Sequence, residues 1–227
     1  ATLTINPSDG KVVTATDKVP STKFTDADGD TVTVKLGGKV GTATVYLTNG
    51  KGPIAQLDLA GTDPTRSVVT LADVKPRGVV TDGRVQIGEI HLASGAKALS
   101  LAKADLVGTG LTVNGFLGSL TLGDVKNGAD ITLSGTATNA RGMLLATKVA
   151  LGVVGDGTDL AVAAPLASLR AVAVGAGTIA APSVGAITVT GRAKTKAAAA
   201  IPGDFRSDLT VAGTGLASAR VPALRSL

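Results

Sequence analysis

The stretch LTVNGFLGSLTLGDV, residues 111–125, contains the pattern that decides the fold. Two short segments rich in aliphatic residues, LTV and LGSLTL, flank a corner of Asn, Gly and Phe. Degraded copies of this order (strand, small-residue corner, second strand) return in IAAPSVGAITVTG (179–191) and LTVAGTGLASARV (209–221). Self-similarity without a strict period is typical of a solenoid whose coils vary in length.

The amino-acid composition indicates many short strands and few helices. The 227 residues include 29 Thr and 30 Gly, and 16 of the 17 acidic residues are Asp, with Glu89 the exception. Asp and Gly favour turns, Thr and Val fit strands, and Glu would favour helices. Aromatic residues make up only 2% of the chain, so its core must consist of Val, Leu, Ile and Ala.

We predict an all-β fold, a parallel β-helix (β-solenoid) with irregular coils of roughly 20 to 25 residues. Successive strands would stack about 4.8 Å apart, with inward side chains forming aliphatic columns and small residues at the corners. Residues 24–227 are assigned to the solenoid, and residues 1–23 to an N-terminal cap or edge strand region. Loops are expected to project near residues 192–205 and 74–84. The alternative is two β-sandwich domains that meet near residue 80, although sandwiches of this size usually contain larger core aromatics.

Four phrases occur in an order that is more specific than any one of them alone. They are FTDADGDTVTVKLGG (24–38), GFLGSLTLGDVKNGADITL (115–133), IAAPSVGAITVTGRAK (179–194) and IPGDFRSDLTVAG (201–213). In these phrases the chain resembles repetitive β-helix modules of very large predicted surface or secreted proteins of environmental bacteria. The resemblance implies an extracellular structural or adhesive role, and it brings no catalytic residues to this chain.

Charge and cysteine content restrict the partners and the chemistry. The net charge is +5, but the 13 Lys and 9 Arg are spread singly, and the aromatic platforms of nucleic-acid surfaces are missing. We therefore expect no nucleic-acid partner, whereas a basic surface also suits an acidic polysaccharide or an anionic cell envelope. Without Cys the chain has no disulfide and no thiolate metal site. No segment approaches transmembrane length, so no membrane span is expected. Because the chain begins with Ala1, we expect a processed form or an excised segment.

The stretch DADGD is the candidate metal site. Its three carboxylates, Asp26, Asp28 and Asp30, have the i, i+2, i+4 spacing with which calcium loops begin, and a cation would relieve their repulsion. The sixth and twelfth positions of an EF-hand loop, however, hold Thr and Gly instead of Gly and Glu. We therefore favour a solvated turn on which calcium has little effect, and we keep the three aspartates as candidate calcium ligands. GDGTD (155–159) is a weaker candidate.

No motif predicts an enzyme, and no catalytic or cofactor-binding residue is assigned. The single histidine, His91, lies in a strand-like segment, so neither a Ser-His-Asp triad nor a three-histidine zinc site is expected. Glycoside hydrolysis needs two carboxylates across a sugar ring, and such sites usually add aromatic platforms that this chain lacks. A solenoid carbohydrate-active enzyme or polysaccharide-binding module is the alternative function.

The working hypothesis is a noncatalytic, extracellular structural or adhesive module of a bacterial cell-surface or secreted assembly. Its expected partners are other copies or further coils of a larger surface protein, with acidic polysaccharide as a further candidate. The C-terminal segment, residues 209–227, keeps the strand-and-corner pattern almost to its end and has no amphipathic helix to cap it. We therefore expect that end to abut a further coil or another copy.

Overall fold

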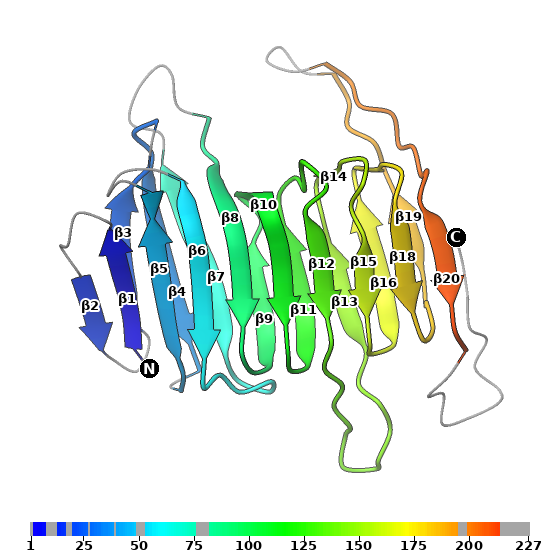
Figure 1. Cartoon of the computed structure of the whole chain (residues 1–227), viewed down its shortest axis with the longest axis horizontal. Helices are drawn as coiled ribbons and strands as arrows, with labels where there is room; N and C mark the ends of the chain where they lie inside the picture. Colours follow the sequence, from blue (N-terminus) through cyan, green and yellow to red (C-terminus); the bar gives the residue numbers. More distant parts are fainter. Residues whose placement is uncertain are drawn as a thin grey trace.

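The protein is all-β, as predicted (Figure 1). The structure, a computed structural model, describes residues 2–7, 13–16, 20–26, 28–38, 40–48, 53–75, 82–194 and 199–213. Within these ranges every regular element is a β-strand, and no helix is long and apolar enough to cross a membrane.

The strands form two facing sheets, with a short two-stranded sheet beside them. The ten-stranded sheet, in front in Figure 1, has the order β2 (Val13–Thr16), β1 (Thr2–Pro7), β5 (Thr42–Leu47), β6 (Ile54–Ala60), β8 (Val85–Leu92), β10 (Ala104–Val113), β12 (Asp130–Leu133), β15 (Leu160–Val162), β18 (Thr178–Ala181) and β20 (Asp208–Val211). The eight-stranded sheet behind it has the order β19 (Ile187–Val189), β16 (Leu166–Ala171), β13 (Thr147–Ala150), β11 (Leu117–Leu122), β9 (Ala96–Leu101), β7 (Val68–Lys75), β4 (Thr31–Gly37) and β3 (Ser21–Thr25). The small sheet pairs β14 (Val153–Val154) with β17 (Ala173–Val174).

From β6 onward the chain alternates between the two large sheets. Each strand of the ten-stranded sheet is followed by a strand of the eight-stranded sheet, up to β20. Within each sheet, all neighbouring strands of this part run parallel. Parallel neighbours need a crossover connection, and here the crossover is the passage through the opposite sheet.

The N-terminal part pairs differently from the parallel coils expected from residue 24 onward. β1 and β2, β3 and β4, and β5 and β6 form antiparallel pairs, and β4 is also antiparallel to β7. The sequence explains two of these pairs, because DADGD joins β3 to β4 and the connection from β5 to β6 contains Asn49-Gly50, a strong hairpin signal. β1 is parallel to β5, but the alternation between the two sheets that makes a coil begins only at β6.

Both sheets continue across residue 80. β6 pairs with β8, and β7 pairs with β9, so strands on either side of this position share both sheets. Two separate sandwiches meeting there do not fit this pairing. Residues 1–23, assigned to a cap or edge, include β1, β2 and the first part of β3, and β2 and β3 are the edge strands of their sheets.

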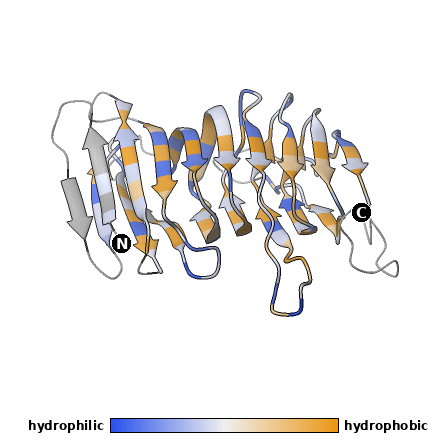
Figure 2. Cartoon of the chain, turned by 60° about the horizontal axis from the view of Figure 1, so that its bottom comes forward, coloured by the Kyte–Doolittle hydropathy of each residue, from blue (hydrophilic) through white to orange (hydrophobic). Residues whose placement is uncertain are grey.

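Aliphatic side chains from both sheets fill the space between them in columns, as expected. Figure 2 shows the corresponding alternation of hydrophobic and hydrophilic bands along the strands. On the ten-stranded sheet, one column of buried, registered residues comprises Val45, Leu57, Ile90, Leu111, Ile131, Leu160 and Ile179. A column on the eight-stranded sheet comprises Val69, Leu99, Leu120, Val149, Leu169 and Ile187. Because these side chains are of similar size, successive strands stack without a bulky centre.

Glycines at one corner let the backbone of successive strand pairs approach closely. Gly95, Gly115 and Gly135 follow β-strands of the ten-stranded sheet and lie above one another. A Cβ at Gly115 would overlap the backbone of Gly95, and a Cβ at Gly135 would overlap that of Gly115. Only glycine fits such a corner, which is the physical reason for the Gly-containing breaks in the sequence.

Segments that leave the sheets include one that the sequence did not indicate. In the expected 192–205 loop, Arg192 forms an antiparallel bridge with Ile201, while residues 195–198 lie outside the described part. Of the expected 74–84 loop, residues 74 and 75 belong to β7, and residues 76–81 lie outside it too. The unexpected loop follows β12 and extends below the sheets in Figure 1, with a bridge between Thr138 and Leu144. Its apolar end, MLLA, resembles the start of a strand, which is why the loop was missed.

Candidate metal centre

The DADGD stretch forms the turn of the hairpin between β3 and β4. The amide of Asp26 donates to the carbonyl of Asp30 at 3.0 Å, and the amide of Gly29 donates to the carbonyl of Asp26 at 3.3 Å. Gly29 has a φ of 98°, which favours glycine at this position. This tight turn brings three aspartates that are close in sequence to the same side of the backbone.

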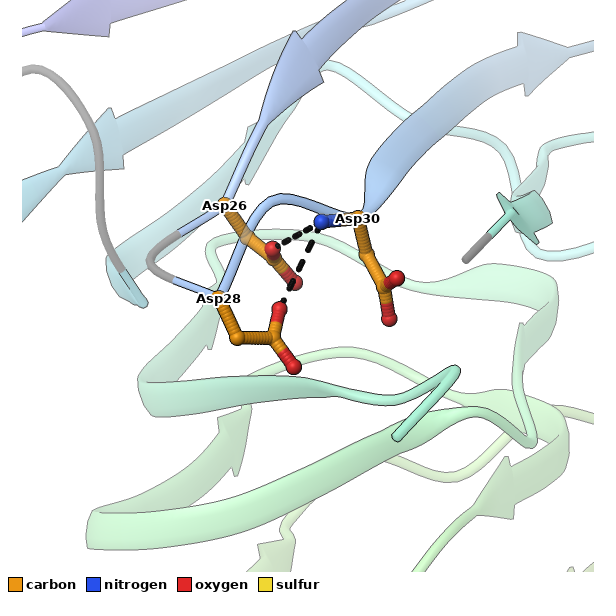
Figure 3. A group of neighbouring side chains, drawn as sticks. All are labelled: Asp26, Asp28 and Asp30. Carbon is orange, nitrogen blue, oxygen red and sulfur yellow. Dashed lines mark hydrogen bonds between the residues drawn. The ribbon is translucent and has the colours of Figure 1, made fainter. Parts of the chain in front are cut away.

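The three carboxylates converge (Figure 3). One oxygen from each of Asp26, Asp28 and Asp30 lies within 4.8 Å of the others. The amide of Asp30 donates to Oδ1 of Asp26 at 2.8 Å and to Oδ1 of Asp28 at 3.4 Å, which fixes both side chains. In the part of the chain that the structure describes, this is the one group of three acidic or histidine side chains with metal-binding geometry.

Two of these three aspartates are buried, so the expectation of a fully solvated turn is wrong. Asp26 is 6% exposed and Asp30 is fully buried, whereas Asp28 is exposed. The covering residues come from the segment before β8. A pocket of about 130 Å³ remains between the two parts, and it is lined by Asp26, Asp28, Pro53, Asp82, Arg84 and Gln86.

Backbone amides of that covering segment hold the cluster in place. The amide of Gly83 donates to Oδ2 of Asp30 at 2.8 Å, and the amide of Asp82 donates to Oδ2 of Asp28 at 3.3 Å. The other oxygen of Asp30, Oδ1, is buried without a hydrogen-bond partner. A buried, unpaired carboxylate oxygen is costly, so this atom is the strongest indication that the site takes a further ligand.

The electrostatics of the cluster favour either a proton or a cation. Burial raises the pKa of Asp26 to about 7, and its hydrogen bond with Asp28 acts in the same direction. The same hydrogen bond lowers the pKa of Asp28. One proton shared by this pair therefore relieves part of the repulsion in acid, whereas above neutral pH the cluster becomes an anionic, all-oxygen site.

An all-oxygen anionic site suits a hard divalent cation. Calcium takes six to eight oxygen ligands and tolerates irregular geometry, whereas magnesium demands a near-ideal octahedron. Asp26, Asp28 and Asp30 would supply carboxylate oxygens, and the pocket has room for water as the remaining ligands. Arg84 also lines the pocket, but its guanidinium is bound to another carboxylate, Asp105.

Asp105 is the centre of a separate, buried ion cluster. Its side chain is 5% exposed, and it accepts hydrogen bonds from Arg84 Nε at 3.0 Å, Lys126 Nζ at 2.7 Å and the amide of Asp124 at 2.8 Å. Burial opposes ionisation of Asp105, but these hydrogen bonds together outweigh it and hold its pKa below the usual range. Every oxygen of Asp105 is occupied, so the cluster is structural.

Other aspartates tie each coil to the next through the backbone, a role that the sequence analysis missed. Asp124 Oδ1 accepts from the amide of Val153 at 2.9 Å, and Asp130 Oδ1 from that of Asp159 at 2.9 Å. The two acidic residues of GDGTD do the same, since Asp156 accepts from Ala176 and Asp159 from Thr178, each at 2.8 Å. This weaker calcium candidate is therefore a pair of corner acceptors. The excess of Asp over Glu was the available signal, because Asp readily accepts hydrogen bonds from nearby backbone amides at turns.

The single histidine lies on the outer face of the ten-stranded sheet. His91 Nδ1 is 4.0 Å from Asp58 Oδ1, and the His91 side chain is 43% exposed. No serine or threonine hydroxyl in the described ranges donates a hydrogen bond to His91, so no nucleophile is paired with this base.

The comparisons with known proteins found no match. No family model fits the chain, and neither a curated protein nor a solved structure is significantly similar to it. The arguments below therefore start from the fold and from the geometry of the side chains.

Proposed function

We propose that this chain is a noncatalytic structural or adhesive module of an extracellular, bacterial cell-surface or secreted assembly. In this proposal the alternating strands from β6 to β20 are successive coils of an open parallel β-helix, and the antiparallel strands at the N-terminus close one end of it. Such coils contact only their neighbours and can be extended by further coils or copies.

One observation carries the proposal: the outer faces of both large sheets consist mostly of small side chains. On the ten-stranded sheet one outward row comprises Thr112, Thr132, Ala161, Ala180 and Thr210. On the eight-stranded sheet the corresponding row comprises Thr70, Ser100, Thr121, Ala150, Arg170 and Thr188. Each face also carries an open hollow, of about 450 Å³ on the ten-stranded sheet and about 350 Å³ on the eight-stranded sheet. Broad faces of this kind suit contacts with another extended surface.

We further propose that the DADGD turn binds calcium and thereby joins the N-terminal hairpin to the first parallel coil. The support is the buried Oδ1 of Asp30, which has no hydrogen-bond partner, and the approach of the three carboxylates to within 4.8 Å of one another. Calcium would bind the hairpin side chains while the amides of Asp82 and Gly83 hold the same carboxylates from the next coil. The role of the ion would be structural.

The alternative, a carbohydrate-active enzyme, has one specific observation in its favour. The pocket beside the turn is lined by Asp26, Asp28, Asp82 and Arg84, and the pKa of Asp26 is raised while that of Asp28 is lowered. A pair of carboxylates with separated pKa values is typical of acid–base catalysis. Against it stands the volume of about 130 Å³, because pockets for drug-sized ligands measure roughly 300–1,000 Å³. No aromatic side chain lines the pocket, so we favour an ion over a sugar.

Two measurements test the proposed role. Antibody labelling of intact source cells should detect the chain at the surface or in the secreted fraction. Incubation of the purified chain with a panel of acidic and neutral polysaccharides should release no reducing ends or unsaturated products. Product release that is abolished in Asp26→Asn and in Asp28→Asn would overturn the noncatalytic assignment in favour of the enzyme.

A further inference from the structure

Acidic and basic residues are segregated between the two sheets. The strands of the ten-stranded sheet contain five acidic residues and no Lys or Arg; these are Asp58, Glu89, Asp105, Asp130 and Asp208. The strands of the eight-stranded sheet contain six basic residues, with Asp73 as the one acid; these are Lys23, Lys35, Lys75, Lys97, Lys148 and Arg170.

Most of these charges are available to a partner. Lys35, Lys97, Lys148 and Arg170 are exposed, and their side chains make no ion pair within the ranges that the structure describes. On the other sheet, Asp208 is exposed and Glu89 half-exposed, also without an ion pair in the described ranges. Only Asp105 is buried, in its cluster with Arg84.

The segregation makes the two outer faces complementary. The two sheets lie in separate layers, so their outer faces point in opposite directions (Figure 1). A copy that is displaced straight along the sheet normal therefore brings its acidic face onto the basic face of its neighbour. Neighbouring strands are about 4.8 Å apart in both sheets, so charged residues on successive strands recur with the same spacing on the two faces.

Lys148 and Arg170 lie on the half of the basic face nearer the C-terminal coils. They lie on the neighbouring strands β13 and β16, around a shallow hollow of about 350 Å³ whose other polar lining residues are Ser119, Thr121 and Ser168. The acids on the other face include Glu89, Asp130 and Asp208, and Asp159 lies beside Asp130 just before β15, since its amide donates to Oδ1 of Asp130 at 2.9 Å. Carboxylates on this face can reach cations in such a hollow when the small side chains of both faces are in contact.

We propose that copies of this chain stack face to face, with the outer face of the ten-stranded sheet of one copy against the outer face of the eight-stranded sheet of the next. The inference rests on the proposed role as an assembly module, and it identifies the partner as a second copy. Because the two contacting faces differ, the contact is heterologous and continues into an open-ended stack.

The contact should be weak and sensitive to salt. Seven parallel strands by four or five residues give a face of roughly 30 Å by 15 Å, which is below the about 800 Å² per partner of stable interfaces. Exposed ion pairs contribute little each, and salt screens them over about 8 Å at physiological ionic strength. Stacking is therefore expected at high protein concentration and low ionic strength.

Charge reversal tests the proposal. Sedimentation velocity at low salt should show association of the parent chain. Lys148→Glu with Arg170→Glu, and separately Glu89→Lys with Asp208→Lys, should each weaken the association about tenfold or more, because like charges then face each other. Neither pair of positions forms a side-chain bond in the described fold, so both double variants should keep the circular dichroism and melting temperature of the parent. Arg141→Glu with Arg192→Glu changes the charge as much as the first variant but off both faces, and it should associate like the parent.

A mixture decides the orientation of the contact. Equal amounts of the two face variants should associate where each alone does not, because the reversed basic face then meets the reversed acidic face. Failure of the mixture to associate would overturn the face-to-face contact. Oligomers that persist in both variants would also overturn it, while leaving the assembly role intact through end-to-end contacts. Loss of association only in the Lys148 and Arg170 variant, with a parent chain that binds an acidic polysaccharide, would replace the second copy by that polymer.

Discussion

The amide of Gly83 donates a hydrogen bond of 2.8 Å to Oδ2 of Asp30, across 53 residues of sequence, and leaves Oδ1 of Asp30 buried without a partner. This bond connects the turn of the first described hairpin of the eight-stranded sheet to the segment that leads into β8. This free oxygen, on a residue whose carboxylate lies within 4.8 Å of two others, is the basis of the calcium proposal.

Calcium should stabilise the parent chain. At pH 8, calcium at about 100 times its dissociation constant would add about 2.7 kcal/mol to the free energy of unfolding. For a chain of this size that corresponds to a rise of about 5–10 °C in melting temperature. Asp30→Asn should lose most of this rise, and magnesium should produce less of it. Thermal melts in chelator and in millimolar calcium that coincide for the parent would show that the turn binds no calcium.

The stability of the calcium-free chain should depend on pH through Asp26. Its pKa is raised from 3.8 in the unfolded chain to about 7 in the fold, so the folded state holds the extra proton between these values. This contribution to stability is complete below pH 4 and is lost as the pH rises through 7. Asp28 has a lowered pKa in the fold, so its contribution to the free energy of unfolding is lost as the pH falls, and only below about pH 4.

Urea unfolding in chelator at pH 4.5 and pH 7.5 measures this dependence. The parent should be less stable at pH 7.5, and Asp26→Asn, which keeps a neutral side chain at both pH values, should show a smaller difference. Equal differences in parent and variant would contradict the assignment of the raised pKa to Asp26.

An aspartate placed in an aliphatic column should destabilise several coils together. Val113 is fully buried and Leu122 is 3% exposed, so Val113→Asp or Leu122→Asp would bury an unpaired carboxylate at a cost of about 4 kcal/mol or more. The neighbouring outward positions supply matched controls, because Thr112→Asp and Thr121→Asp should cost about 1 kcal/mol or less. Urea melts in which the inward and outward variants are equally stable would contradict the inward placement.

The Asp105 cluster should contribute much more to stability than a comparable surface pair. Asp105→Asn leaves Arg84 and Lys126 without their shared carboxylate, and we expect a loss of roughly 3 kcal/mol, at the lower end for a broken buried pair because both cations keep some access to water. Asp156→Asn, which weakens the exposed pair with Arg206, should cost at most about 1 kcal/mol. Chemical denaturation of both variants at pH 7 gives the comparison. Equal losses in the free energy of unfolding would show that burial does not strengthen the ion pairs of Asp105.

The sequence predicted the composition of the core better than the pairing of the strands. Columns such as Leu111, Ile131 and Leu160 follow from apolar alternation and the shortage of aromatics, since both are local properties. The antiparallel pairs before β6 follow instead from turns, for which DADGD and Asn49-Gly50 are the local signals in the sequence. Direction is a relation between segments, which a repeat read along one chain does not specify.

At the candidate site, too, the sequence predicted the local feature but not the contact between distant segments. The spacing of Asp26, Asp28 and Asp30 identified the ligand set, but their burial depends on a segment more than 50 residues away. No property of the turn itself indicates that the amide of Gly83 will lie on Asp30. The segregation of charge between the sheets could not be seen either, because it appears only when alternate strands are assigned to opposite sheets.

The most direct test of the account is the molar mass of the parent chain in solution, measured by light scattering over a range of protein concentrations at low salt. An assembly module with complementary faces predicts masses that rise with concentration above the 22.2 kDa of one chain, and that fall back toward it when salt is added. A mass of 22.2 kDa at every concentration and ionic strength would contradict the proposed assembly role.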